Sequence, residues 1–85
     1  MQEFLEYIIN QIVNKPEEVK ISKQDESGLI VYMIEVADED MGVIIGKEGR
    51  TIKSIRSLIK AKAIKDGVRV RIELIDKQNQ QNDQI

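Results

Sequence analysis

The chain has 85 residues, enough for one small domain with a modest core. It contains neither cysteine nor histidine, so disulfides, thiolate metal sites and cysteine–histidine catalysis are excluded. The net charge of −2 conceals a segregation: residues 47–71 carry nine basic side chains against two acidic ones, whereas residues 1–46 carry three against ten. A mildly acidic chain can therefore present a local basic face to a phosphate backbone, although most charge runs only solvate a helix.

The first half of the chain predicts a helix, two strands and a second helix. Apolar residues at helical spacing predict an amphipathic helix over residues 2–14, which Pro16 closes. Alternation predicts a short strand over residues 19–23, turn-forming residues occupy 25–28, and the apolar run 29–36 predicts the best-buried strand. Asp38 is the expected N-cap of a short helix that ends at Ile45.

The second half predicts a basic helix and a last strand. The helix carries a narrow apolar stripe formed by Ile52, Ile55, Ile59 and Ala63. Leu58 and Ile64 lie off this stripe and are expected to be buried at its flanks, with a partner surface as the alternative. Gly67 makes the turn into a strand over residues 68–74, on which Arg69 and Arg71 are expected to face solvent.

These elements predict one α+β domain over residues 1–76. Their order is α-β-β-α-α-β, with a three-stranded mixed sheet that carries three helices on one face. The polar low-complexity tail, residues 77–85, is expected to be disordered.

The most informative motif is the loop Gly46-Lys47-Glu48-Gly49, which lies between the short helix and the basic one. Glycines let the main chain approach a phosphate because no Cβ stands in the way, and the next helix directs its N-terminal amides to the same place. A G-x-x-G loop between two helices is the device with which a KH domain grips single-stranded nucleic acid. Alone, the pattern would favour an ordinary helix–helix turn; the flanking isoleucines, the basic helix and the element order favour the KH interpretation.

Residues 43–55, VIIGKEGRTIKSI, resemble the KH signature of an I-G-x-x-G core followed by spaced isoleucines. The element order resembles a type II KH domain, and residues 1–76 resemble the small bacterial single-KH proteins of the KhpA (YlqC-type) family. The resemblance implies single-stranded RNA as the ligand, and a homodimer or a heterodimer with a KhpB/Jag-type RNA-binding protein. It also implies a post-transcriptional regulator or RNA chaperone linked to cell elongation and division.

The expected RNA-binding residues surround the loop: Ile45, Gly46, Lys47, Glu48, Gly49, Arg50, Ile52 and Lys53. Amides of the loop would receive phosphates, three cations would neutralise them, and the grip would span about four nucleotides. The isoleucines flanking the loop are expected to be mainly core residues, with some flooring a shallow groove for bases; these are Ile44, Ile45, Ile52 and Ile55. Glu48 departs from the neutral or basic residues common at this position, and its charge could weaken binding.

Other functions have less support. A P-loop is excluded because Gly42 and Gly46 are separated by three residues instead of four, and Lys47 is not followed by Ser or Thr. No nucleophile–base pair or ligand constellation is recognisable, so neither an enzyme nor a cofactor is expected. No signal peptide or membrane span is predicted, and a cytoplasmic location is expected. The main alternative is a KH-fold dimerisation adaptor that acts through protein contacts. A helix-turn-helix DNA binder is weaker because strands flank the helices.

Overall fold

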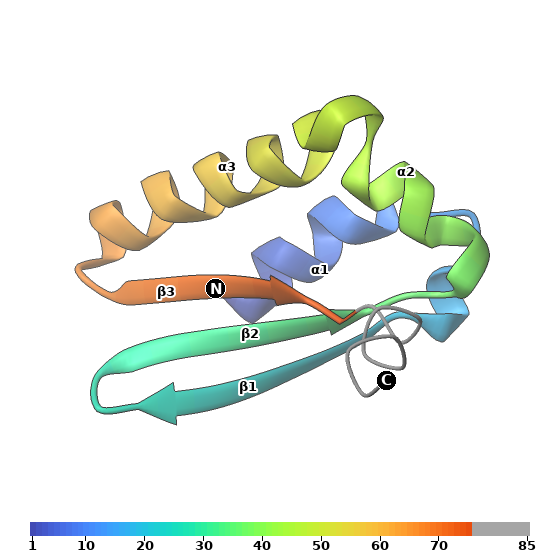
Figure 1. The fold of residues 1–85 in the computed structure, drawn as a ribbon. Coiled ribbons are helices and arrows are strands. Elements are labelled where there is room, and N and C mark those ends of the chain that lie inside the picture. The colour runs from blue at the N-terminus through green and yellow to red at the C-terminus, as the bar shows by residue number, and fades with distance from the viewer. Residues whose placement is uncertain (76–85) are drawn as a thin grey trace, which may run out of the picture.

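In the computed structural model, which describes residues 1–75, three α-helices cover one face of a three-stranded sheet (Figure 1). The helices are α1 (Gln2–Asn10), α2 (Met41–Ile45) and α3 (Arg50–Asp66), and the strands are β1 (Lys20–Glu26), β2 (Leu29–Glu35) and β3 (Arg69–Leu74). Short 3₁₀ turns lie at η1 (Pro16–Glu18), η2 (Asp38–Asp40) and η3 (Lys47–Gly49). The predicted order α-β-β-α-α-β is confirmed. The tail predicted over residues 77–85 lies outside the described residues.

The sheet has the order β1-β2-β3, with β1 antiparallel and β3 parallel to the central strand. The hairpin is tighter than predicted, because β1 continues to Glu26 and only Ser27 and Gly28 form the turn. Both turn residues have positive φ, 56° and 91°, which matches the twist of a two-residue hairpin. The parallel pair requires the crossover through α2 and α3, and this crossover places the G-x-x-G loop beyond the edge of the sheet.

The core fills the space between the helices and the sheet. The central strand supplies its largest side chain, Tyr32, which is 2% exposed. The stripe predicted on α3 is confirmed, because all four of its residues are buried. The main core cluster contains Leu5, Ile9, Val13, Tyr32, Ile34, Val36, Ile44, Ile52, Ile55, Ile59 and Ile72. Burial of this apolar surface is the dominant favourable term in folding, and it fixes α3 over the sheet.

Two local predictions in the first half of the chain were wrong. The first helix ends at Asn10 and not at residue 14, and Val13 joins the core from the irregular segment that follows it. Asp38 is not an N-cap: Ala37 precedes η2, and no side chain caps that turn. Asp40 carries the structural role instead. It is fully buried, and its carboxylate accepts hydrogen bonds from the amides of Asn14 at 3.0 Å and Lys15 at 2.9 Å.

Two apolar residues on α3 are also not where the sequence predicted them. Leu58 is 52% exposed and Ile64 is 70% exposed, whereas both were expected to be buried at the flanks of the stripe. The neighbouring elements pack only on the narrow face that Ile55 and Ile59 define. The flanks of the helix are therefore open in this chain taken alone.

Candidate nucleic-acid interface

The G-x-x-G loop is a tight 3₁₀ turn between two helices. α2 ends where the amide of Gly46 donates to Gly42 O at 2.8 Å, and the amide of Gly49 then donates to Gly46 O at 3.1 Å. Glu48 and Gly49 both adopt left-handed conformations, with φ of 57° and 74°, before α3 begins at Arg50. The amide of Arg50 donates to Lys47 O, so the amides that have no acceptor within the turn are those of Lys47 and Glu48, at the start of η3, and these are available to an anion.

The two glycines of the motif have different surroundings. The space where a side chain of Gly46 would lie is filled by Thr51, because a Cβ atom on Gly46 would lie only 2.7 Å from Thr51 Cβ. Around Gly49 the corresponding space is open, and its nearest neighbour is Lys53 Cε at 3.9 Å. Of the two, Gly49 is therefore the position at which a phosphate can come close to the main chain.

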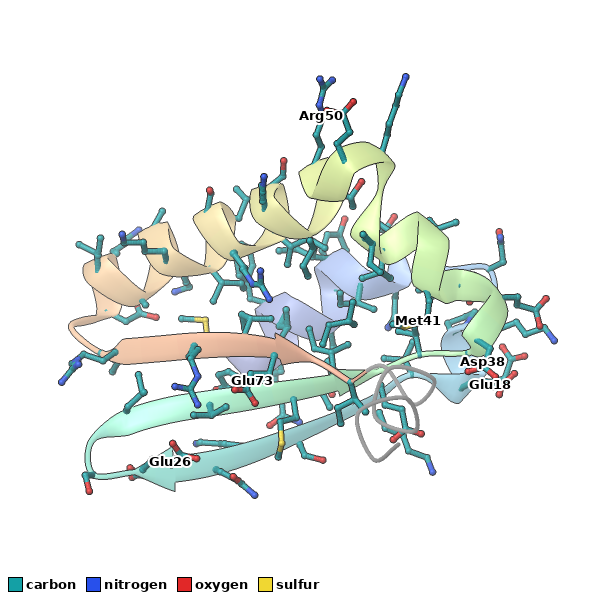
Figure 2. The ribbon with its side chains drawn as sticks, viewed as in Figure 1. Glu18, Glu26, Asp38, Met41, Arg50 and Glu73 are labelled. Atoms are coloured by element: carbon teal, nitrogen blue, oxygen red, sulfur yellow. The ribbon has the colours of Figure 1, made fainter. Side chains whose placement is uncertain are left out.

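Four charged side chains surround the open side of the loop. Those of Lys47, Glu48, Arg50 and Lys53 are all exposed. Arg50 points away from the body of the domain (Figure 2) and its guanidinium lies 3.9 Å from the Glu48 carboxylate. The two side chains are 77% and 69% exposed, so water screens this pair and its contribution to stability is small.

Most of the isoleucines that flank the loop are buried in the core. Ile44, Ile52 and Ile55 are buried, with exposed fractions of 0%, 7% and 2%, while Ile45 is half-buried. The expectation that most of them are core residues is confirmed.

A groove-like hollow in the surface lies away from the loop, between the second half of α3 and β3, where Arg56, Lys60 and Arg69 line it. The sequence showed these cations but gave no sign that they share one groove.

The acidic side chains that give the chain its net negative charge lie away from the loop. Glu17, Glu18, Glu35 and Asp38 line a hollow where η1, β2 and η2 meet, and Figure 2 shows Glu18 and Asp38 together there, far from Arg50. The basic loop is thus separated in space from most of the acids, as the segregation in the sequence indicated.

Comparison with known proteins identifies the family of the chain. Residues 2–74 match the family model described as the KhpA/KhpB KH domain. The chain belongs to the KhpA/KhpB KH-domain family. Its fold is accordingly that of a type II KH domain, and the loop 46–49 lies between α2 and α3 within the matched residues.

Several relatives match over most of their length. The chain is 49% identical over 76 residues to the RNA-binding protein KhpA of Chlamydia pneumoniae, covering 89% of this chain and 97% of the relative. It is 44% identical over 75 residues to the RNA-binding protein KhpA of Clostridium acetobutylicum, covering 88% and 100%. It is 52% identical over 61 residues to the RNA-binding protein KhpA of Thermotoga maritima, covering 72% and 81%.

Two further observations concern other kinds of site. Residues 1–75 contain no group of three or more acidic side chains arranged to hold a metal ion. Within the same residues, no helix combines the length and the apolarity needed to cross a lipid bilayer.

Proposed function

We propose that this chain binds single-stranded RNA through the loop 46–49 and the first turn of α3, gripping about four nucleotides. The observation that carries the proposal is the geometry of the loop: the amides of Lys47 and Glu48 have no acceptor within the turn, the approach to the main chain at Gly49 is open, and three exposed cations flank it. The relatives named as RNA-binding proteins support RNA as the ligand.

Each residue of the site has a distinct role in this proposal. The amides of the loop donate hydrogen bonds to one phosphate, with the positive end of α3 behind them. Lys47, Arg50 and Lys53 neutralise neighbouring phosphates. Ile45, half-buried beside Gly46, offers apolar surface to a base, whereas Ile52 holds the loop from within the core. Aromatic stacking is not expected to dominate, because the three aromatic residues belong to α1 and β2 and none is part of the loop or of α3.

The loop can be tested by changing Lys47 and Glu48 together to Asp. We expect the fold to survive, because both side chains are exposed and Asp tolerates the left-handed conformation at position 48. RNA binding should be lost, because two carboxylates would face the phosphate. The measurement is a titration of ¹⁵N-labelled protein with short mixed-sequence RNA at low salt, in which shifts of residues 46–53 report binding.

The matched control is Lys65→Asp, which makes the same change in net charge at an exposed position near the far end of α3. This variant should bind RNA like the wild type. Unchanged binding by a folded loop double mutant would show that the loop is not the site.

Salt dependence separates RNA binding from protein adaptor function. Three neutralised phosphates predict a slope of about −2 for log K against log salt, from roughly −0.7 per phosphate on a single strand. An RNA interaction insensitive to salt, together with unshifted loop resonances, would favour the alternative in which the domain acts as a dimerisation adaptor.

We also propose that the working unit is a dimer, either of two copies or with a KhpB/Jag-type RNA-binding protein. The exposed Leu58 on α3 supports this, since an apolar side chain that is 52% exposed is better accommodated in an interface. Leu58→Glu should lower the mass measured by sedimentation if two copies meet there. A dimer would add avidity to a weak four-nucleotide grip.

The family resemblance extends the proposal to post-transcriptional control of cell elongation and division. Deletion of the gene, followed by measurement of cell length and shape, would test this role.

A further inference from the structure

We infer that Thr51 is a positioning residue of the proposed RNA site: its side chain restrains Gly46, and through Gly46 it orients the free amide of Lys47 toward a phosphate. This inference rests on the proposed function and deepens it. The role is not visible in the sequence, because Thr51 lies outside the G-x-x-G motif and carries no charge.

Thr51 and Gly46 are in contact across the start of the loop. A Cβ atom added to Gly46 would overlap the Thr51 hydroxyl oxygen and would lie 2.7 Å from Thr51 Cβ, so these two atoms lie against the Gly46 main chain. Thr51 is the second residue of α3, and the next residue, Ile52, is buried. Its backbone is therefore fixed by a helix that is anchored in the core, and its β-branched side chain has few rotamers. Thr51 thus forms a stiff wall on one side of Gly46.

Gly46 needs such a restraint because glycine has no side chain of its own. Its φ of 75° and ψ of 174° lie in a region essentially restricted to glycine, the residue with the greatest backbone freedom. Two hydrogen bonds hold its main chain, from the Gly46 amide to Gly42 O at 2.8 Å and from the Gly49 amide to Gly46 O at 3.1 Å. The contact with Thr51 adds a third restraint, on the side where a Cβ would lie.

The orientation of Gly46 determines where the Lys47 amide points. The peptide bond between them is planar and trans, so the Lys47 N–H points opposite to the Gly46 carbonyl. That carbonyl accepts the hydrogen bond from Gly49 within the turn, which directs the Lys47 N–H away from the turn. The Lys47 amide is one of the two that have no acceptor there. A displacement of Gly46 therefore misaligns a donor of the proposed phosphate site.

The Thr51 hydroxyl restrains Gly46 by contact and not by a hydrogen bond. It forms no hydrogen bond to another of residues 1–75. Serine would supply the same two contacting atoms, Cβ and Oγ, whereas alanine lacks the oxygen and leaves Gly46 free to move into the vacated space. Alanine is also the residue most favourable to a helix, so α3 should form in Thr51→Ala.

The test compares Thr51→Ala with Thr51→Ser in binding a short mixed-sequence single-stranded RNA. Affinity is measured by fluorescence anisotropy between about 50 and 200 mM salt, and circular dichroism checks the fold of each variant. Thr51→Ala should weaken binding about tenfold, because the Lys47 amide loses its alignment with a charged acceptor. The slope of log K against log salt should keep its wild-type value, because the cations are unchanged. Thr51→Ser should bind as the wild type does.

Two controls separate positioning from loss of charge and from loss of any hydroxyl. Lys47→Ala removes a cation and should make the salt slope shallower by roughly 0.7, the value for one phosphate on a single strand. Ser57→Ala removes a hydroxyl from an exposed position of the same helix and should bind like the wild type.

Three results would overturn the positioning role while the loop site stands: wild-type affinity in a folded Thr51→Ala, a loss that Thr51→Ser shares, or a salt slope in Thr51→Ala as shallow as that of Lys47→Ala. An equal loss in Ser57→Ala would overturn it as well, because the effect would then not depend on contact with Gly46. Failure of the wild type to bind the RNA would overturn the proposed function, and the positioning role with it.

Discussion

Gly46 lies against Thr51, so closely that any side chain at position 46 would have to displace it. A Cβ on Gly46 would clash with the Thr51 hydroxyl and would lie 2.7 Å from Thr51 Cβ and 2.8 Å from the Thr51 amide nitrogen. The first glycine of the motif is therefore required for packing within the loop. The second, Gly49, is required for its positive φ and leaves its outer side open.

This difference predicts unequal costs for the two alanine substitutions. Gly49→Ala should lower the free energy of unfolding by about 1 kcal/mol, the cost of a left-handed conformation for a residue with a Cβ. Gly46→Ala should cost more, about 2–4 kcal/mol, because Gly46 has φ 75° and ψ 174°, a conformation essentially restricted to glycine, and the clash with Thr51 adds to this conformational cost. Urea denaturation of both variants would measure the difference.

Thr51→Ala should rescue part of the Gly46→Ala defect, since it removes the hydroxyl but leaves the Cβ and the backbone nitrogen in place. The rescue is an interaction energy that a double-mutant cycle isolates. Equal costs for the two glycine substitutions, with no coupling between positions 46 and 51, would contradict the packing role of Gly46.

Alanine substitutions at Asp40 and at its neighbour Asp38 should have different effects on stability, and Asp38 serves as the control. The buried carboxylate of Asp40 satisfies the amides of Asn14 and Lys15, which ties the segment after α1 to the start of α2. Asp40→Ala should lower the free energy of unfolding by about 3 kcal/mol, because loss of the fully buried carboxylate leaves two partly buried amides without their acceptor. Asp38→Ala should have an effect within about 0.5 kcal/mol, since Asp38 is exposed and caps no helix. Thermal or urea unfolding that ranked the two aspartates the other way would refute this assignment.

The elements that were predicted correctly have periodic apolar patterns. The stripe on α3 and the apolar run of β2 each bury one consistent set of side chains, so spacing alone identifies them. The G-x-x-G loop was also recognisable, because backbone positions with positive φ favour glycine, and the spacing of glycines can be read from the sequence.

What the sequence did not reveal depends on contacts between distant residues. Asp40 bonds to amides 25 and 26 positions away, and no local pattern distinguishes it from the exposed Asp38. Likewise, Lys60 and Arg69 line one groove only because α3 folds back over β3. The roles of the two glycines differ for the same reason, since only the folded loop brings Thr51 against Gly46.

Tyr32 predicts a loss of stability at alkaline pH. Burial raises the pKa of its phenol above the ordinary value of 10.0, so the folded state holds this proton more tightly than the unfolded state. The contribution is fully present below pH 10 and is lost as pH rises through the folded-state pKa, because the unfolded chain ionises first. Tyr32→Phe should reduce the fall in urea midpoint between pH 9 and pH 11. The pKa of Lys15 is raised by its hydrogen bond to Glu39, so Lys15 also makes stability fall as pH rises, and Tyr32→Phe leaves this contribution unchanged. An identical pH profile for both proteins would show that Tyr32 does not contribute.

Glu48 combines a left-handed backbone with a negative charge beside the proposed phosphate path, and two substitutions separate these effects. Glu48→Gln removes only the charge, and should tighten RNA binding about two- to threefold at low salt, with the gain fading as salt screens the site. Glu48→Gly removes the charge and relieves the backbone, and should raise the free energy of unfolding by about 0.5–1 kcal/mol relative to Glu48→Gln. Because both variants lack the carboxylate, their RNA affinities should match if charge is the cause. Tighter binding in Glu48→Gly alone would instead assign the effect to the shape of the loop.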